Sequence, residues 1–190
     1  MKFQIEKAKL LNALNMVIGA VPNKATIQVL NNFAVRLEGN ALEISATDLD
    51  LGIRVKLDVQ GESDGAVVVN ARKLLDLVKS LIDPKIVNLT IEVVDYLVTV
   101  RWSERGKASI TGFDVSDFQP LPNVEDGGTL QLGKSELEFL AGKTLFAVST
   151  DQTRMSLNGV YVEAKDGKLV MVATDGHRLG KAFIELENST

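Results

Sequence analysis

One short segment, ATDGHRLG at residues 173–180, contains the residue types that could perform acid–base chemistry. Asp175, His177 and Arg178 could supply an acid, a base and a clamp for an anion, and His177 is the only histidine in the chain. Catalysis requires a base and a nucleophile that face each other, whereas adjacent residues of a strand point to opposite faces. Asp175 and His177 would share a face only if the backbone through Gly176 stayed extended. A small hydrolase or transferase using Asp175 and His177 is one hypothesis, and this requirement argues against it.

The same segment could instead be a turn that another molecule recognises. An aspartate such as Asp175 accepts hydrogen bonds from the backbone of a turn, and a glycine such as Gly176 adopts a positive φ at little cost. These residues alone leave both interpretations open, because neither explains why a histidine and an arginine follow.

Composition excludes several other kinds of site. The 190-residue chain has no cysteine, which removes disulfides, thiolate metal ligands and cysteine nucleophiles, and fits the reducing cytoplasm. With one histidine, a transition-metal site would need a cage of carboxylates, and no spaced cluster of acids supplies one. A glycine-rich phosphate loop is also missing. We therefore expect neither a metal nor a cofactor.

The amino-acid composition is that of a folded protein inside the cell. Hydrophobic residues make up 45% of the chain and charged residues 24%. No run of apolar residues is long enough for an export signal or a membrane span. The net charge of −4 argues against a surface that is basic all over, but it leaves room for a local basic stripe.

Two segments of the chain repeat the same apolar pattern. Leu10, Leu11, Leu14, Val17 and Ile18 recur at helical spacing, and a second set repeats that spacing position for position: Leu74, Leu75, Val78, Leu81 and Ile82. A strand-like segment precedes each helix and three follow it. The expected strands are residues 2–5, 32–38, 41–48 and 52–59 in the first repeat, and 66–70, 88–94, 96–102 and 107–113 in the second. The predicted unit is a strand, a helix and three strands.

A third unit begins after a polar, glycine-containing segment at residues 122–128. Residues 129–132 read as its first strand, a helix follows, and three strands fill residues 159–186. ATDGHRLG then matches ATDLDLG at residues 46–52, so that Asp175 aligns with Asp48. If two units make a domain, residues 1–125 are complete and residues 126–190 are half a domain. The third unit should therefore need a partner to cover its sheet.

The outward faces of the helices carry the basic residues of interest. In the second helix the apolar stripe leaves Arg72 and Lys79 on the opposite side, with Lys73 at its flank, and Lys24 lies in the loop after the first helix. A solvated face is the ordinary explanation for any one of these charges. Repeated helices that lie side by side would pool them into a lining that meets a polyanion without reading its sequence.

Several segments together resemble the bacterial DNA polymerase III beta subunit, the sliding-clamp family, along the whole chain and in the expected order. They are MKFQIEKAKLLNAL, ATDLDLGIRV, VNARKLLDLVKSL, DFQPLP and LNGVYVE followed by VATDGHRL. The resemblance implies an α+β DNA clamp fold with helices on one face and antiparallel sheets on the other. It also implies a homodimeric ring that encircles duplex DNA, tethers the replicative polymerase for processive synthesis and has no enzymatic activity.

Site residues and partners are also implied by the resemblance. The DNA-facing residues would be Lys24, Arg72, Lys73 and Lys79. A pocket for short peptide motifs of DNA polymerases and clamp-loader subunits would include Arg154, Leu157, Thr174, Gly176, His177, Arg178 and Leu179. In that pocket His177 and Arg178 would form rim and wall, and Leu157 and Leu179 an apolar floor. The expected location is the bacterial cytoplasm, at the nucleoid during replication.

Family members have six units, whereas this chain has three. The rest of the second domain and all of the third domain are therefore expected to be absent, either because the chain is a fragment or because a short chain assembles differently. In the second case, the third unit would complete its domain in trans with another chain.

Overall fold

The fold is given by a computed structural model that describes residues 1–22, 27–119, 121, 130–151 and 153–186. The chain divides into two compact units, Met1–Asn123 and Val124–Thr190.

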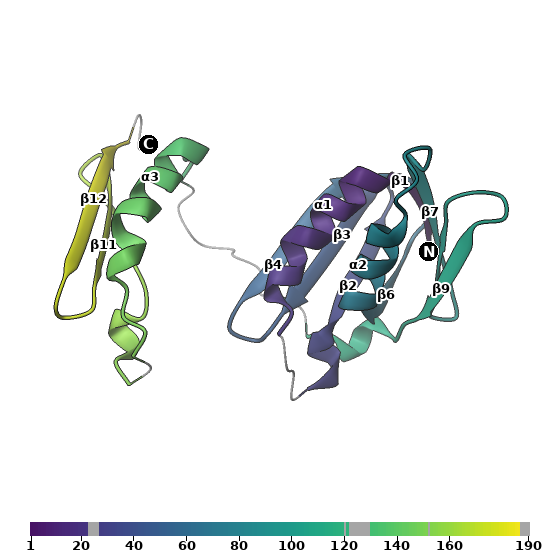
Figure 1. The fold of residues 1–190 in the computed structure, drawn as a ribbon, viewed down its shortest axis with the longest axis horizontal. Coiled ribbons are helices and arrows are strands. Elements are labelled where there is room, and N and C mark those ends of the chain that lie inside the picture. The colour runs from purple at the N-terminus through teal and green to yellow at the C-terminus, as the bar shows by residue number, and fades with distance from the viewer. Residues whose placement is uncertain (23–26, 120, 122–129, 152, 187–190) are drawn as a thin grey trace. The chain divides into compact units, whose positions relative to one another are not determined.

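Where the structure describes it, the first unit is built from two antiparallel sheets and two α-helices (Figure 1). One sheet has the strand order β5-β1-β7-β8-β9 and the other the order β4-β3-β2-β6. The helices are α1 (Lys7–Val17) and α2 (Ala71–Ser80). The strands are β1 (Lys2–Glu6), β2 (Asn32–Glu38), β3 (Ala41–Thr47), β4 (Gly52–Asp58), β5 (Gln60–Ser63), β6 (Gly65–Asn70), β7 (Asn88–Val94), β8 (Leu97–Arg101) and β9 (Lys107–Thr111).

The two repeats of this unit exchange their first strands. β1, which opens the first repeat, pairs antiparallel with β7 of the second, with Phe3 opposite Ile91. β6, which opens the second repeat, pairs antiparallel with β2 of the first, with Val67 opposite Val35. Each sheet of this unit is therefore completed by a strand of the other repeat.

The helices pack side by side against the sheets and close a large core (Figure 1). The helical spacing of the apolar residues turns one stripe of each helix inward, and it includes Leu10, Leu14, Leu74 and Val78. These side chains meet the inward residues of both sheets in one cluster. The burial confirms the predicted inward stripe of the two helices, with Ile82 as the exception.

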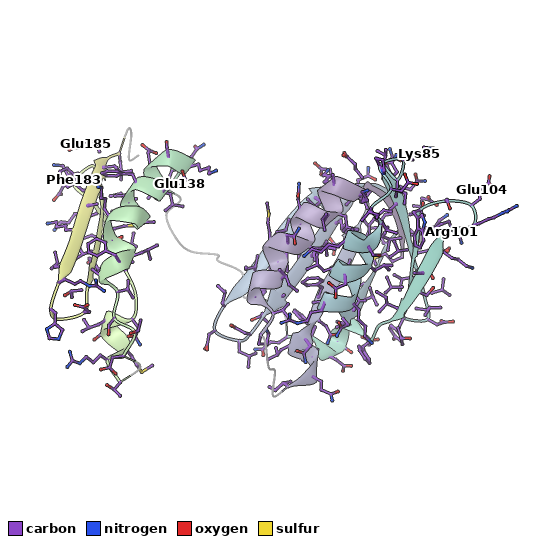
Figure 2. The ribbon with its side chains drawn as sticks, in the orientation of Figure 1. Lys85, Arg101, Glu104, Glu138, Phe183 and Glu185 are labelled. Carbon is purple, nitrogen blue, oxygen red and sulfur yellow. The ribbon has the colours of Figure 1, made fainter. Side chains whose placement is uncertain are left out.

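In the described residues of the second unit, one α-helix packs with a three-stranded antiparallel sheet of order β10-β11-β12. The elements are α3 (Lys134–Thr144), β10 (Tyr161–Lys165), β11 (Lys168–Thr174) and β12 (Leu179–Glu185). Leu140, Leu169, Met171 and Ala182 form its small buried cluster. Figure 2 shows Phe183 and Glu185 on β12, where Lys168 lies over the Phe183 ring and 3.2 Å from the Glu185 carboxylate.

Three details differ from the sequence-based expectations. Ile82 does not belong to the buried stripe of α2: it is 88% exposed, because the helix ends at Ser80 and Leu81 has left the helical conformation. Residues 130–132 form no strand, although the apolar–polar alternation predicted one. The short strand β5, which pairs with β1, was not predicted. Lys24 and the expected linker at 122–128 lie outside the described residues.

Candidate functional site

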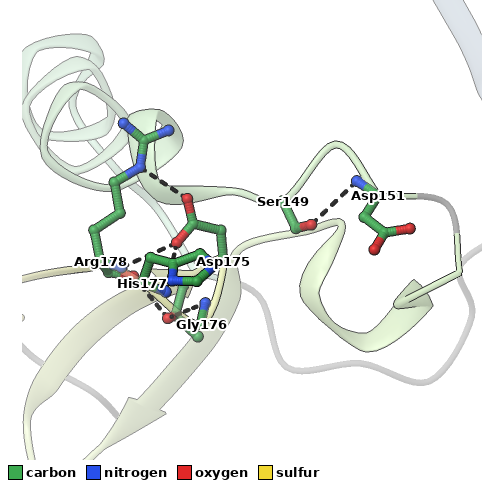
Figure 3. Close-up of polar contacts among 7 residues, drawn as sticks. Ser149, Asp151, Asp175, Gly176, His177 and Arg178 are labelled. Carbon is green, nitrogen blue, oxygen red and sulfur yellow. Dashed lines mark hydrogen bonds and ion pairs between the residues drawn. The ribbon is translucent and has the colours of Figure 1, made fainter.

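The segment at 173–180 is a tight turn between β11 and β12 that Asp175 holds together (Figure 3). One oxygen of the Asp175 carboxylate accepts hydrogen bonds from the backbone N–H groups of His177, at 2.9 Å, and Arg178, at 3.0 Å. The other oxygen accepts from Nε of Arg178 at 2.9 Å. Gly176 has a φ of +90°, so the backbone does not stay extended. Among the described residues no hydrogen bond joins the carboxylate to the His177 imidazole, which leaves the hydrolase hypothesis without its acid–base pair.

Thr174 completes the turn from the other side. Its hydroxyl donates to the carbonyl oxygen of Arg178 at 2.7 Å and accepts from the backbone N–H of Gly176 at 3.1 Å. Three consecutive residues, Thr174, Asp175 and Gly176, thus fix the backbone, and the two that follow present their side chains outward. His177 and Arg178 are both exposed.

These hydrogen bonds also set the charge of the turn. Donation from the backbone N–H groups of His177 and Arg178, aided by the Arg178 guanidinium, lowers the pKa of Asp175 from 3.8 to about 2. Asp175 therefore remains a carboxylate throughout the physiological range and keeps its ion pair with Arg178.

A second segment, which contains Val148–Asp151 and Arg154, lies beside this turn. The segment and the turn together line a cavity of about 290 Å³. The lining residues are Val148, Ser149, Thr150, Asp151, Arg154, Asp175, His177 and Arg178. Ser149 and Asp151 stabilise the second segment, since the Asp151 N–H donates to the Ser149 hydroxyl (Figure 3). Asp151 also forms an ion pair of 3.6 Å with Arg154. The cavity is thus walled by polar and charged groups of both signs.

The structure brings some of the predicted pocket residues together and leaves others outside the cavity. Arg154, His177 and Arg178 line it, whereas Thr174 and Gly176 shape the turn behind them. The expected floor residues do not line it: Leu157 is half-buried in a short 3₁₀ turn, Met155–Leu157, and Leu179 is 62% exposed at the start of β12.

Five residues at this site were not predicted from the sequence: Phe146 and the lining residues Val148, Ser149, Thr150 and Asp151. The Arg178 guanidinium lies 5.8 Å from the centre of the Phe146 ring, and Phe146 is 54% exposed. Phe146 lies in the short 3₁₀ turn Leu145–Ala147 that follows α3, and an aromatic residue at the end of the helical pattern was the one signal in the sequence. Ser149 and Asp151 carry no local pattern that points to β12.

The basic residues of α2 lie where the helical spacing places them. Arg72, Lys73 and Lys79 are exposed, together with one acid, Asp76. Asn70 caps the helix by accepting the Lys73 N–H at 3.0 Å, which fixes the first turn that carries Arg72 and Lys73. Outward residues of the adjacent α1 are mostly neutral, and its Lys9 donates to the carbonyl oxygen of Asp58.

Two further properties concern the described residues only. No group of three or more His, Asp or Glu side chains in them could hold a metal ion. None of the helices in this part of the chain is both long and apolar enough to cross a membrane.

Solved structures place this architecture in the class of DNA sliding clamps. A sliding clamp from Bacillus subtilis matches with a TM-score of 0.91 and 29% identity over 100% of this chain and 51% of its own. The DNA polymerase III subunit beta from Pseudomonas aeruginosa matches with a TM-score of 0.86 and 33% identity over 97% of this chain and 50% of its own. The predicted α+β clamp fold is confirmed.

Sequence comparison identifies the family. The DNA polymerase III beta subunit N-terminal domain matches residues 1–122, and the central domain of that subunit matches residues 131–190. The chain belongs to the DNA polymerase III beta subunit family. The beta sliding clamp of Vibrio cholerae is 34% identical over 98% of the chain, and that of Caulobacter vibrioides 36% identical over 96%. The chain spans about half the length of these curated relatives.

Proposed function

We propose that this chain is the N-terminal portion of a bacterial DNA sliding clamp, which encircles duplex DNA and tethers the replicative polymerase for processive synthesis. In this proposal residues 1–125 are the first clamp domain and residues 126–190 the first half of the second. The chain acts by binding and enclosure and has no enzymatic activity of its own. It works in the bacterial cytoplasm, at the nucleoid during replication, as part of a ring of two subunits.

The observation that carries the proposal is the paired helices α1 and α2, which cover the sheets and turn Arg72, Lys73 and Lys79 outward. A helix surface with a few cations neutralises phosphates without reaching base edges, so binding is independent of sequence and sensitive to salt. Asp76 lies among these cations and weakens the attraction. A ring that cannot fall off needs no tight contacts, and weak contacts allow it to slide. Lys24 is proposed to extend the same basic surface.

The experiment is a salt titration of the 190-residue chain on a fluorescent DNA duplex. Replacing Arg72, Lys73 and Lys79 together by Ala should reduce the slope of log K against log salt by up to about 2.7, at about 0.9 per lost phosphate contact. A matched control removes three exposed lysines from strands, Lys56, Lys107 and Lys181. Equal loss in both variants would show that only net charge matters and would refute the DNA-facing assignment.

The turn between β11 and β12 is proposed as part of a pocket for short peptide motifs of DNA polymerases and clamp-loader subunits. Rigid hydrogen bonding of Thr174 and Asp175 presents His177 and Arg178 at a cavity, beside the exposed Leu179. Arg154 and Leu157 would contribute from the second segment, and Gly176 would allow a peptide to approach the backbone closely. Because the cavity lacks an apolar floor, we expect only weak binding by this chain.

A peptide titration followed by NMR tests this assignment. A synthetic peptide that carries the clamp-binding motif of a bacterial replicative polymerase should shift the amide signals of residues 174–179. Arg178→Ala and Leu179→Ala should each weaken binding several-fold. Phe183→Ala is the control, since Phe183 is a similarly exposed apolar residue of the same strand, 53% exposed. Unchanged affinity in the first two variants would refute the pocket.

A further inference from the structure

The two units place a large and a small residue in opposite order at one contact between a 3₁₀ turn and a strand. In the first unit the turn that follows α1 contains Gly19, and Ile53 of β4 lies beside it: a Cβ added to Gly19 would be 3.7 Å from the Cδ1 atom of Ile53. In the second unit the equivalent positions, counted from the starts of α3 and β12, are Phe146 and Gly180. A Cβ added to Gly180 would be 3.4 Å from the Phe146 ring. The large side chain therefore belongs to the strand in the first unit and to the turn in the second.

A second difference between the units lies just before the same strand. Arg178 directly precedes β12, and the equivalent residue before β4 is Leu51. The Arg178 guanidinium lies 5.8 Å from the centre of the Phe146 ring. The first unit cannot form this contact, because it has Gly19 and Leu51 at the two positions. The ring and the cation that meet in the second unit are thus both absent from the matching positions of the first.

Asp175 contacts the same guanidinium through a bond that its turn does not require. Asp48 and Asp175 are equivalent, and each accepts two backbone hydrogen bonds that close its turn. The other carboxylate oxygen of Asp175 also accepts from Nε of Arg178 at 2.9 Å. In the first unit the turn closes without such a bond, because Leu51 has no side-chain donor. The bond between Asp175 and Arg178 is therefore additional to the repeated turn.

These two contacts restrict Arg178 and leave most of its donors available (Figure 3). A guanidinium has five N–H donors in a rigid plane, and Asp175 takes the one on Nε. Within the described part of the chain, no hydrogen bond or ion pair involves the terminal nitrogens of Arg178. Ordering a long side chain on binding costs free energy, and a side chain that is already held loses less. Arg178 lines the cavity, so its terminal N–H groups can donate to a ligand there.

We propose that Asp175 and Phe146 are positioning residues of the peptide pocket, which together hold the Arg178 guanidinium at the cavity for donation to a bound peptide. This inference rests on the proposed pocket and adds two residues that act through Arg178. Phe146 itself does not line the cavity, and both oxygens of Asp175 are engaged by the turn and by Arg178. Because the ion pair and the ring contact are exposed, loss of either should weaken peptide binding only about two- to five-fold.

The side-chain Nε–H signal of Arg178 tests the positioning without a ligand. In the NMR spectrum of the nitrogen-labelled 190-residue chain, Arg178→Ala identifies this signal by its disappearance. Asp175→Asn keeps an oxygen for the backbone of the turn but loses the acceptor for Nε, and Phe146→Leu removes the ring while keeping an apolar side chain. Each change should shift the Arg178 signal. Asp48→Asn, the equivalent change in the first unit, is the control and should leave it in place. A signal that neither variant shifts, or that the control shifts equally, overturns the proposal.

A peptide titration tests whether the two residues act through Arg178. The synthetic peptide with the clamp-binding motif of a bacterial replicative polymerase is titrated into variants with and without Arg178→Ala. Asp175→Asn and Phe146→Leu should each weaken binding about two- to five-fold when Arg178 is present and should have no further effect when it is absent. Equal losses in both backgrounds overturn the proposal, because the residues would then act through the shape of the turn alone.

Controls separate this proposal from folding and from the pocket itself. Far-UV circular dichroism at neutral pH shows whether each variant is folded, and Phe146→Leu, which leaves every hydrogen bond of the turn in place, decides the outcome if Asp175→Asn unfolds the second unit. A parent chain that binds no peptide refutes the proposed pocket, and the Arg178 signal then decides the positioning by itself. Peptide binding that Arg178→Ala weakens, together with an Arg178 signal that ignores Asp175 and Phe146, refutes the positioning and leaves the pocket standing.

Discussion

Asp48 and Asp175 make the same pair of backbone hydrogen bonds in two copies of one turn. Asp48 accepts from the N–H groups two and three residues ahead at 3.1 and 2.7 Å, and Asp175 does so at 2.9 and 3.0 Å. The preceding threonines, Thr47 and Thr174, also make matching bonds. This turn is therefore part of the repeated fold, and the difference between the copies lies in the side chains it presents.

The two copies of the turn predict opposite changes in stability when the residue at one equivalent position is exchanged between them. Leu49 and Gly176 occupy the same position with φ of 84° and 90°, a conformation that costs a residue with a Cβ about 1–2 kcal/mol. Leu49 is 53% exposed, so it gains little from burial. Leu49→Gly should stabilise the first unit by about 1 kcal/mol and Gly176→Leu should destabilise the second by a similar amount. Thermal unfolding of both variants measures this, and shifts of the same sign would contradict it.

The charge of Asp175 predicts that its contribution to the stability of the folded chain depends on pH. Because the backbone hydrogen bonds of the turn lower its pKa to about 2 from an ordinary 3.8, the native state binds the proton less readily than the unfolded chain does. Its stabilisation should be fully present above about pH 4 and should disappear as the pH falls through 2. The difference in unfolding temperature between the parent chain and Asp175→Asn should therefore shrink over this range. A difference that stays constant down to pH 2 would show that charge is not involved.

The difference in burial along α1 predicts that two of its residues contribute very differently to stability. Leu10 is 2% exposed and Met16 is 62% exposed. Leu10→Ala should cost about 2–5 kcal/mol of the free energy of unfolding, since it leaves a cavity between both sheets, whereas Met16→Ala should cost less than about 0.5 kcal/mol. Urea denaturation followed by Trp102 fluorescence measures both. Similar losses would mean that the two helix faces are not distinguished by burial.

The elements of the first unit were largely predictable because their signals are local. Leu74, Leu75 and Val78 repeat at helical spacing, and a cap at Asn70 and a proline at 84 mark the ends. Ile82 was placed in the same stripe because periodicity continues through the sequence after hydrogen bonding has stopped. The helix had already ended at Ser80, and only the geometry of Leu81 shows it.

Strand pairing between repeats was the part that sequence could not supply. Residues 129–132 alternate like a strand, yet β1 and β6 are strands because each has a partner in the other repeat. Whether a partner exists is not a property of the segment itself.

At the candidate site, too, residues with a local sequence signal were predictable, and residues brought there by the tertiary fold were not. Asp175 and Gly176 revealed the turn, since their residue types are specific to turns. Ser149 and Asp151 reach the cavity through the tertiary fold and have no signal of their own.

The two units should unfold separately, and the second should unfold first. Its buried cluster contains only Leu140, Leu169, Met171 and Ala182, whereas one large cluster unites both sheets and both helices of the first unit. Small cores contribute little net stability. The single tryptophan, Trp102, lies in the first unit and packs against its core. On heating, circular dichroism should therefore record an early transition that does not change the fluorescence of Trp102. If both probes reported the same transition, the two units would unfold together.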